Sequence, residues 1–157
     1  SLIYAMDAPA GESDNEYRFG KEYYPYQHQH AAWSLLSQQP PQSLVVTSGT
    51  GSGKTECFLV PVLDDLVRES ERNGTALVGV RALMIYPLNA LIASQRDRLN
   101  AWTVNFGYRV RFCLYNGTTP LSVPKWQRQE AMNQVLDRES LRESPPPILV
   151  TNATMLE

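Results

Sequence analysis

The chain has 157 residues, of which 43% are hydrophobic, and this length and composition suit one globular domain with a buried core. The formal net charge of −2 lacks the basic excess of a simple DNA-binding module, but it does not exclude a motor that holds phosphates through backbone amides. The sequence contains no signal peptide and no apolar run long enough to span a bilayer, so we expect no membrane partner.

The two cysteines, Cys57 and Cys113, lie far apart in apolar surroundings. Their number and spacing indicate neither a disulfide framework nor a zinc site. We therefore expect reduced core residues in a cytoplasmic, intracellular protein.

The segment before residue 48 begins with a stretch that lacks periodicity and continues into a predicted helix and strand. Residues 1–16 mix Gly, Pro, Ser and acidic residues without periodicity, which predicts a linker or the tail of a preceding segment. An aromatic-rich stretch follows, and a helix is predicted from about Gln27 to Ser37, where Pro40 and Pro41 stop it. The short apolar, β-branched run at 44–47 then predicts a buried strand.

Residues 48–55, Ser-Gly-Thr-Gly-Ser-Gly-Lys-Thr, have the composition of a phosphate-binding loop. Glycines let backbone N–H groups turn around a phosphate, and the N-terminus of a following helix adds partial positive charge. The motif predicts that Lys54 reaches the β- and γ-phosphates of a nucleotide and that the Thr55 hydroxyl holds Mg²⁺. The sequence therefore predicts binding of ATP with Mg²⁺, with Lys54 and Thr55 as the catalytic residues of this segment.

The rest of the chain alternates between helices and strands. Helices are predicted from the loop to about Arg72, at 90–106 and at 125–142, and strands at 82–86, 109–115 and 148–151. Pro61 is expected to kink the first of these helices. Strands that alternate with helices pair in parallel through right-handed crossovers. The predicted fold is α/β, a doubly wound parallel sheet of the P-loop NTPase type.

Several segments, in order, resemble the motifs of superfamily 2 DEAD/DEAH-type helicases. The loop, with Ser48 where the commonest pattern has glycine, resembles motif I, and Tyr-Gln-His-Gln-His-Ala-Ala at 26–32 resembles the Q-motif region. This resemblance implies that the Gln29 amide forms hydrogen bonds with the edge of an adenine base, and that Tyr24 or Tyr26 stacks on the base. The implied nucleotide-binding residues are Tyr26, Gln29, Ser48, Gly49, Thr50, Gly51, Ser52, Gly53, Lys54, Thr55 and Glu56.

Three later segments resemble the parts of these helicases that follow a nucleic-acid strand. They are Tyr-Pro-Leu-Asn-Ala-Leu at 86–91, Asn-Gly-Thr-Thr at 116–119 and the segment 148–157 with its Thr-Asn-Ala-Thr-Met-Leu stretch. The combination is closest to Lhr-like and related large bacterial helicases, including some in repair or phage defence. The implied nucleic-acid contacts are Pro87, Leu88, Asn89, Gly117, Thr118, Thr151 and Asn152, with DNA favoured over RNA.

No acidic pair follows an apolar strand, as motif II of these helicases would require. We therefore expect residues 17–157 to be the amino-terminal part of a RecA-like ATP-binding domain that is incomplete without motif II. A second RecA-like domain and further domains of a parent chain are the implied partners. The segment alone is expected to bind ATP weakly and not to hydrolyse it.

Other functions remain compatible with the loop. The main alternative is a nucleotide-binding switch or assembly module that does not separate strands. A restriction-type double-strand translocase would share the same motifs. A P-loop kinase is less favoured, because Gln29 and the 86–95 segment would then be coincidences.

Overall fold

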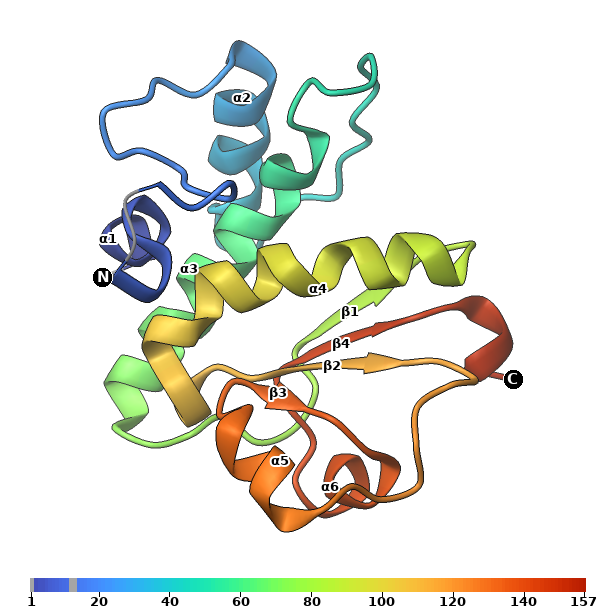
Figure 1. The fold of residues 1–157 in the computed structure, drawn as a ribbon. Coiled ribbons are helices and arrows are strands. Elements are labelled where there is room, and N and C mark those ends of the chain that lie inside the picture. The colour runs from blue at the N-terminus through green and yellow to red at the C-terminus, as the bar shows by residue number, and fades with distance from the viewer. Residues whose placement is uncertain (1, 12–13) are drawn as a thin grey trace. The chain divides into compact units, whose positions relative to one another are not determined.

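A computed structural model of the chain describes residues 2–11 and 14–157 (Figure 1). The chain forms two compact units. One contains residues up to Lys21 together with Leu66–Glu157, and the other contains Glu22–Asp65. The long helix α3, Lys54–Asn73, contributes residues to both.

A four-stranded parallel sheet forms the centre of the first unit. The strands are β1 (Ala82–Ile85), β2 (Phe112–Tyr115), β3 (Gln134–Val135) and β4 (Ile148–Thr151). Their order across the sheet is β1-β4-β2-β3, and every neighbouring pair is parallel. Ile85, Thr151 and Tyr115 share one register position, so β1, β4 and β2 end level with one another. The predicted α/β class with a parallel sheet is confirmed.

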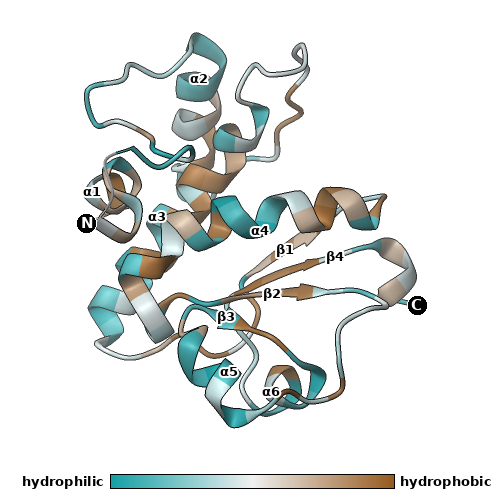
Figure 2. Ribbon diagram, in the orientation of Figure 1, coloured by the Kyte–Doolittle hydropathy of each residue, from teal (hydrophilic) through white to brown (hydrophobic). Residues whose placement is uncertain are grey.

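Helices lie on both sides of this sheet. In Figure 1, α4 (Asn89–Thr103) crosses one face, whereas α5 (Lys125–Glu130) and α6 (Arg138–Glu143) lie on the other side. Short 3₁₀ segments occupy Pro9–Gly11, Val104–Arg109 and Ala153–Met155. Ile92, Leu99 and Trp102 of α4 are at most 2% exposed, as are Phe112, Ile148 and Val150 of the strands. The strands are accordingly brown over most of their length in Figure 2. Burial of this apolar surface is the main force that holds α4 on the sheet.

The segment before the aromatic stretch is more ordered than its sequence predicts. Residues 2–7 form α1 (Leu2–Asp7), in which Met6 is 1% exposed. Arg18 Nη2 lies 2.7 Å from Asp7 Oδ1, and Trp102 Nε1 donates to the Tyr17 carbonyl at 2.8 Å. The sequence of residues 2–7 does not indicate this helix, because a six-residue helix shows no period in sequence and tertiary packing stabilises it. The assignment of 1–16 to a linker or the tail of a preceding segment stays a prediction. Residues 1, 12 and 13 of that stretch lie outside the described residues, and the domain boundary at 16/17 stays a prediction.

The second unit contains α2 (Gln27–Leu36) and the first part of α3. The predicted helix at 27–37 is confirmed within one residue, and α3 ends at Asn73, close to the predicted end at about Arg72. Pro61 lies inside α3, and the kink expected there stays a prediction. The predicted strand at 44–47 was wrong. Within the described chain this segment joins no strand ladder, and Val45 is 89% exposed. An apolar, β-branched run becomes a strand only beside a partner strand, and its own sequence does not supply one.

The predicted helix at 125–142 was also wrong in part. Two short helices, α5 and α6, are separated by β3, which pairs with Phe112 and Cys113 of β2. Asp137 starts the second helix, because its carboxylate accepts from the Ser140 N–H at 2.9 Å. None of the described helices is both long and apolar enough to cross a membrane.

Candidate functional site

The glycine loop leads directly into the first turn of α3, which begins at Lys54. Gly51 and Gly53 have positive φ values of 73° and 75°. At Gly53 an added Cβ would lie 2.3 Å from Gln29 Nε2, so a side chain at this position would need both a strained backbone and a displaced glutamine. The loop conformation therefore explains why glycine occupies these two positions.

The lysine of the loop folds back over the loop itself. Lys54 Nζ donates to the Ser48 carbonyl at 2.8 Å and also to the Gly49 carbonyl. Ser52 Oγ donates to the Gly49 carbonyl at 2.7 Å and contacts Ser48 Oγ. These bonds place the ammonium group inside the turn that the loop makes.

The residues of this loop fit a nucleotide phosphate. A Cβ built at Gly49 or Gly51 would meet nothing within 4 Å, so the space on the Cβ side of these two residues is open. The first N–H groups of a 20-residue helix lack helical acceptors and carry partial positive charge. Together with the Lys54 ammonium they form a donor set that suits a phosphate.

The same residues fit Mg²⁺ only as part of a complex with phosphate. Among residues 2–11 and 14–157 no group of three or more His, Cys, Asp or Glu side chains could hold a metal ion. Mg²⁺ commonly takes one or two protein ligands, with water and substrate phosphates as the rest. The Thr55 hydroxyl is the ligand that the motif predicts.

The amino-terminal end of α2 is hydrogen-bonded to the loop backbone. Gln29 is 4% exposed; its Oε1 accepts from the Tyr26 N–H at 2.9 Å, and its Nε2 donates to the Gly53 carbonyl at 3.2 Å. His28 Nε2 lies 2.8 Å from the neighbouring carbonyl, that of Ser52, which assigns the proton of a neutral ring to Nε2. Two consecutive side chains of α2 thus hold two consecutive carbonyls of the loop.

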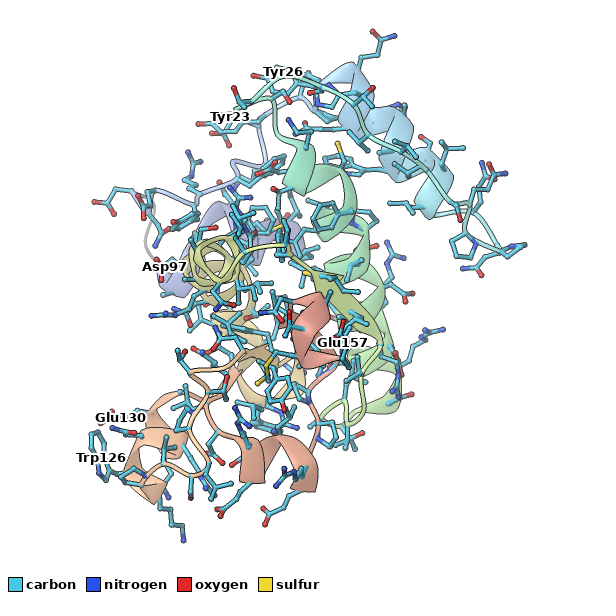
Figure 3. All side chains as sticks on the ribbon, turned by 90° about the vertical axis from the view of Figure 1, so that its right-hand side faces the viewer. Tyr23, Tyr26, Asp97, Trp126, Glu130 and Glu157 are labelled. Atoms are coloured by element: carbon cyan, nitrogen blue, oxygen red, sulfur yellow. The ribbon has the colours of Figure 1, made fainter. Side chains whose placement is uncertain are left out.

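The sequence reasoning did not single out His28 or Trp33. Trp33 Nε1 donates to the Glu56 carbonyl at 2.9 Å in the first turn of α3. His28 lies next to Gln29 within the 26–32 stretch, so the resemblance of that stretch to the Q-motif region could have indicated it. Tyr26 is 64% exposed, stacks on the His28 ring with centroids 5.7 Å apart, and points outward (Figure 3). Tyr24, the other candidate for stacking on the base, is 96% exposed. Neither tyrosine is buried as a core aromatic.

The predicted nucleic-acid contacts follow the carboxyl ends of three neighbouring strands. Residues 86–89 follow β1, Asn152 follows β4, and 116–119 follow β2, so the segment after β4 lies between the other two. Asn152 Nδ2 donates to Asn89 Oδ1 at 2.8 Å, which joins two of the predicted contacts directly. Pro87, Leu88, Asn89, Gly117 and Thr118 are exposed. This edge of a parallel sheet is where such folds bind ligands.

Two residues at this edge have structural bonds. Thr151 is fully buried, and its hydroxyl donates to the Tyr115 carbonyl at 2.7 Å, so its side chain links β4 to β2. Arg138, which sequence reasoning did not select, donates from Nε to the Thr119 carbonyl at 2.9 Å and lies 5.5 Å from the Tyr115 ring centroid. A cation therefore lies against the 116–119 turn, although the predicted contacts were uncharged.

The two thiols are poor nucleophiles. Burial, followed by the charge of Glu56, raises the pKa of Cys57, and burial, followed by the charge of Asp137, raises the pKa of Cys113 to about 12. Both side chains are free and fully buried. They are protonated core residues near neutral pH.

Comparison with known proteins gives a consistent set of relatives. A family model described as DEAD/DEAH box helicase matches residues 26–156. The Druantia protein DruE of Escherichia coli (strain UMEA 4076-1) is 37% identical over 120 residues, which is 69% of this chain and 6% of that protein. The uncharacterized ATP-dependent helicase YprA of Bacillus subtilis (strain 168) is 33% identical over 94 residues, 60% of this chain and 11% of that protein.

A solved structure has the same fold. The crystal structure of the DUF1998 helicase MrfA bound to DNA superposes with a TM-score of 0.57 and 24% sequence identity, over 99% of this chain and 17% of that one. The chain thus spans 6–11% of the length of the two curated relatives and 17% of this structure.

Proposed function

Because the chain belongs to the DEAD/DEAH box helicase family, whose members are ATP-dependent helicases, we propose that it is the ATP-binding part of a DNA helicase or translocase. The observation that carries this proposal is the glycine loop that opens α3, with Gly51 and Gly53 at positive φ and Lys54 inside the turn. The nucleotide supplies a γ-phosphoryl group whose transfer to water drives the motor.

Lys54 and the first turn of α3 would hold the phosphates. The ammonium of Lys54 would exchange its bonds to the Ser48 and Gly49 carbonyls for bonds to the β- and γ-phosphates. The exposed Ser48, Gly49, Thr50 and Gly51, with Ser52 and Gly53, would contribute backbone N–H groups. Thr55 would offer its hydroxyl to Mg²⁺, and Glu56 lies in the same first turn.

Gln29 and Tyr26 would complete the nucleotide site on the side of the base. The bonds of Gln29 to Tyr26 and Gly53 leave each amide atom one further hydrogen-bonding position, which is what reading an adenine edge requires. The exposed ring of Tyr26 offers a surface on which a base can stack. In this proposal Gln29 both supports the loop and selects the base.

The Gln29→Ala variant of the parent protein separates these two roles. We expect ATP affinity to fall by about fivefold to 150-fold, which corresponds to the roughly 1–3 kcal/mol lost when buried partners stay unpaired. GTP affinity should fall less, because loss of the Gly53 bond affects either nucleotide while loss of base reading affects ATP alone. Titration with fluorescent nucleotide analogues measures both affinities.

Gln27→Ala is the matched control, since Gln27 starts the same helix with an exposed side chain. It should leave both affinities unchanged. Equal losses for ATP and GTP at Gln29→Ala would remove the base-reading role. An unchanged GTP affinity would remove the supporting role.

DNA, in preference to RNA, is the proposed track, by which we mean the nucleic acid along which the motor moves. The structural neighbour's title describes a helicase bound to DNA, and the predicted contacts of this chain share the carboxyl edge of the sheet. Backbone N–H groups at the start of α4, the Asn89 and Asn152 amides and the Thr118 hydroxyl would contact phosphates. The buried Thr151 would act indirectly, because its hydrogen bond to the Tyr115 carbonyl fixes the carboxyl end of β4.

A second RecA-like domain and further domains of the parent chain are the proposed partners, and repair or phage defence inside the cell is the proposed setting.

Substitution of the edge residues tests this track. In the parent protein we expect Asn89→Ala, Thr118→Ala and Asn152→Ala together to lower DNA-stimulated ATPase activity by about tenfold or more, since each lost hydrogen bond to phosphate removes roughly 0.5–1.5 kcal/mol. ATP affinity without DNA should persist, because these residues lie outside the loop. Because the contacts are uncharged, the dependence of DNA binding on salt concentration should change little.

A steady-state ATPase assay with and without DNA, together with a salt titration, measures these effects. Ser94→Ala, an exposed polar truncation further along α4, is the control. Unchanged stimulation by DNA in the triple variant would contradict the proposed track and favour the alternative, a nucleotide-binding switch.

A further inference from the structure

A cavity of about 380 Å³ lies beside β3 in the first unit. Its walls come from the segment before β2, from α5 through β3 and from α6, and they include Tyr108, Arg111, Arg128, Met132 and Val135. This volume falls within the range of small-ligand sites. Arg111 precedes β2, and Gln134 starts β3, so the cavity lies toward the amino ends of the strands. The predicted nucleic-acid contacts lie at the opposite, carboxyl edge.

Arg111 brings an uncompensated positive charge to this cavity. Its Nη2 donates to Ser144 Oγ at 2.8 Å and to the Ser144 carbonyl at 3.2 Å, and its buried Nε has no hydrogen-bond partner. Within the part of the chain that the structure describes, no carboxylate forms an ion pair with it. Burial alone lowers the pKa of Arg111, with no opposing effect from a nearby anion. A partly desolvated guanidinium without a counter-ion costs stability unless something compensates it.

The second arginine of the cavity is already neutralised. Arg128 Nε lies 2.9 Å from Oδ2 of the fully buried Asp137, and Arg128 Nη2 lies 3.4 Å from Glu139 Oε2. Arg128 is thus paired with two carboxylates, and Arg111 is the arginine of the cavity that has no paired carboxylate in the described chain. One unpaired guanidinium matches a single carboxylate, in charge and in geometry, better than it matches a doubly charged phosphate.

The remaining surface of the cavity is suited to an apolar group. Met132 and Val135 supply apolar walls, and Tyr108 and Met132 are 62% and 55% exposed. Methionine adapts to the shape of a ligand, and tyrosine offers a broad amphipathic surface. Tyrosine and arginine are enriched among the residues that carry most of the energy of binding.

We propose that this cavity binds a carboxylate carried on an apolar body, with the Arg111 guanidinium paired to the carboxylate. The planar guanidinium matches a carboxylate in geometry, and the ligand would supply the counter-ion that the described chain lacks. The carboxylate belongs either to an acidic side chain of a protein segment or to a small molecule, and both share this chemistry.

Two matched probes test the site in the parent protein: N-acetylphenylalanine, which has a carboxylate, and N-acetylphenylalanine amide, which does not. Saturation-transfer NMR on the probes gives both affinities. We expect the carboxylate probe to bind about tenfold or more tightly than the amide, as a charge-assisted hydrogen bond implies. Arg111→Met should abolish the preference. Arg109→Met, which removes an exposed arginine two residues away, should preserve it.

An absent preference in the unsubstituted protein would overturn the proposal, and this comparison does not depend on how any variant folds. A preference that survives Arg111→Met would overturn it too. The peptides acetyl-Phe-Asp-Leu-amide and acetyl-Phe-Asn-Leu-amide separate the two sources. Tighter binding of the aspartyl peptide than of N-acetylphenylalanine identifies a protein segment, and weaker binding identifies a small carboxylate. ATPase activity should be unchanged in Arg111→Met, so failure here leaves the proposed function intact.

Discussion

Lys54→Ala is expected to reduce ATP turnover of the parent protein by at least about 100-fold, because removal of one group that stabilises developing charge commonly costs this much. The chain has only two other lysines, Lys21 and Lys125, and neither belongs to the glycine loop. Lys54 already bonds two carbonyls of the loop, so its ammonium is held where it can transfer to phosphate oxygens. A steady-state phosphate-release assay measures the loss.

The same substitution should leave folding almost unchanged. Ser48 and Gly49 are exposed, so water can satisfy the carbonyls that Lys54 releases. The melting temperature of Lys54→Ala should therefore stay within about 2 °C of the unsubstituted value, as expected for surface changes of up to roughly 0.5 kcal/mol. Lys125→Ala, an exposed lysine on α5, is the matched control and should retain full turnover. Undiminished ATP hydrolysis by the Lys54→Ala variant would contradict the proposed phosphate site.

The fold could be predicted where local sequence and tertiary environment agree. The run at 148–151 became the buried strand β4, and the helix predicted from the loop to about Arg72 ends at Asn73. The errors arose where a partner outside the local segment decides the structure. Val45 lies in a run as apolar as a strand, yet the described chain gives it no ladder. Gln134 and Val135 form a strand only because β2 lies beside them.

The candidate site was predictable to the extent that its chemistry is contiguous in sequence. The glycine loop is one segment, so its conformation could be predicted from the spacing of its glycines. Gln29 could be identified because the 26–32 segment resembles the Q-motif region. The carbonyl partners of His28 and Trp33 lie 23 or 24 residues along the chain, and hydrogen bonds to a backbone carbonyl leave no mark on the sequence of the acceptor. Arg138 was missed for the same reason, since its partners are carbonyls of the 116–119 turn.

A second large effect is expected at Asp137, on stability and not on catalysis. This carboxylate is fully buried, caps α6 through Ser140, and lies 2.9 Å from Arg128 Nε of α5. Asp137→Ala removes the cap and leaves the Arg128 charge partly buried. Loss of one partner of a buried ion pair costs about 3–5 kcal/mol, and the one-third exposure of Arg128 sets our expectation at the lower end, about 3 kcal/mol.

Hydrogen–deuterium exchange of peptides from 125–143 in the parent protein measures this effect locally. Amide exchange there should be roughly 100-fold faster in Asp137→Ala, as about 3 kcal/mol implies. Glu139→Ala is the matched control. Glu139 also pairs with Arg128, at 3.4 Å, but its side chain is 47% exposed, so its removal should cost at most about 0.5 kcal/mol. Asp137→Asn separates the two roles, since asparagine can still cap α6 but carries no charge. If the amides of 125–143 exchanged equally slowly in Asp137→Ala and in Glu139→Ala, the Arg128–Asp137 pair would not be what stabilises α5 and α6.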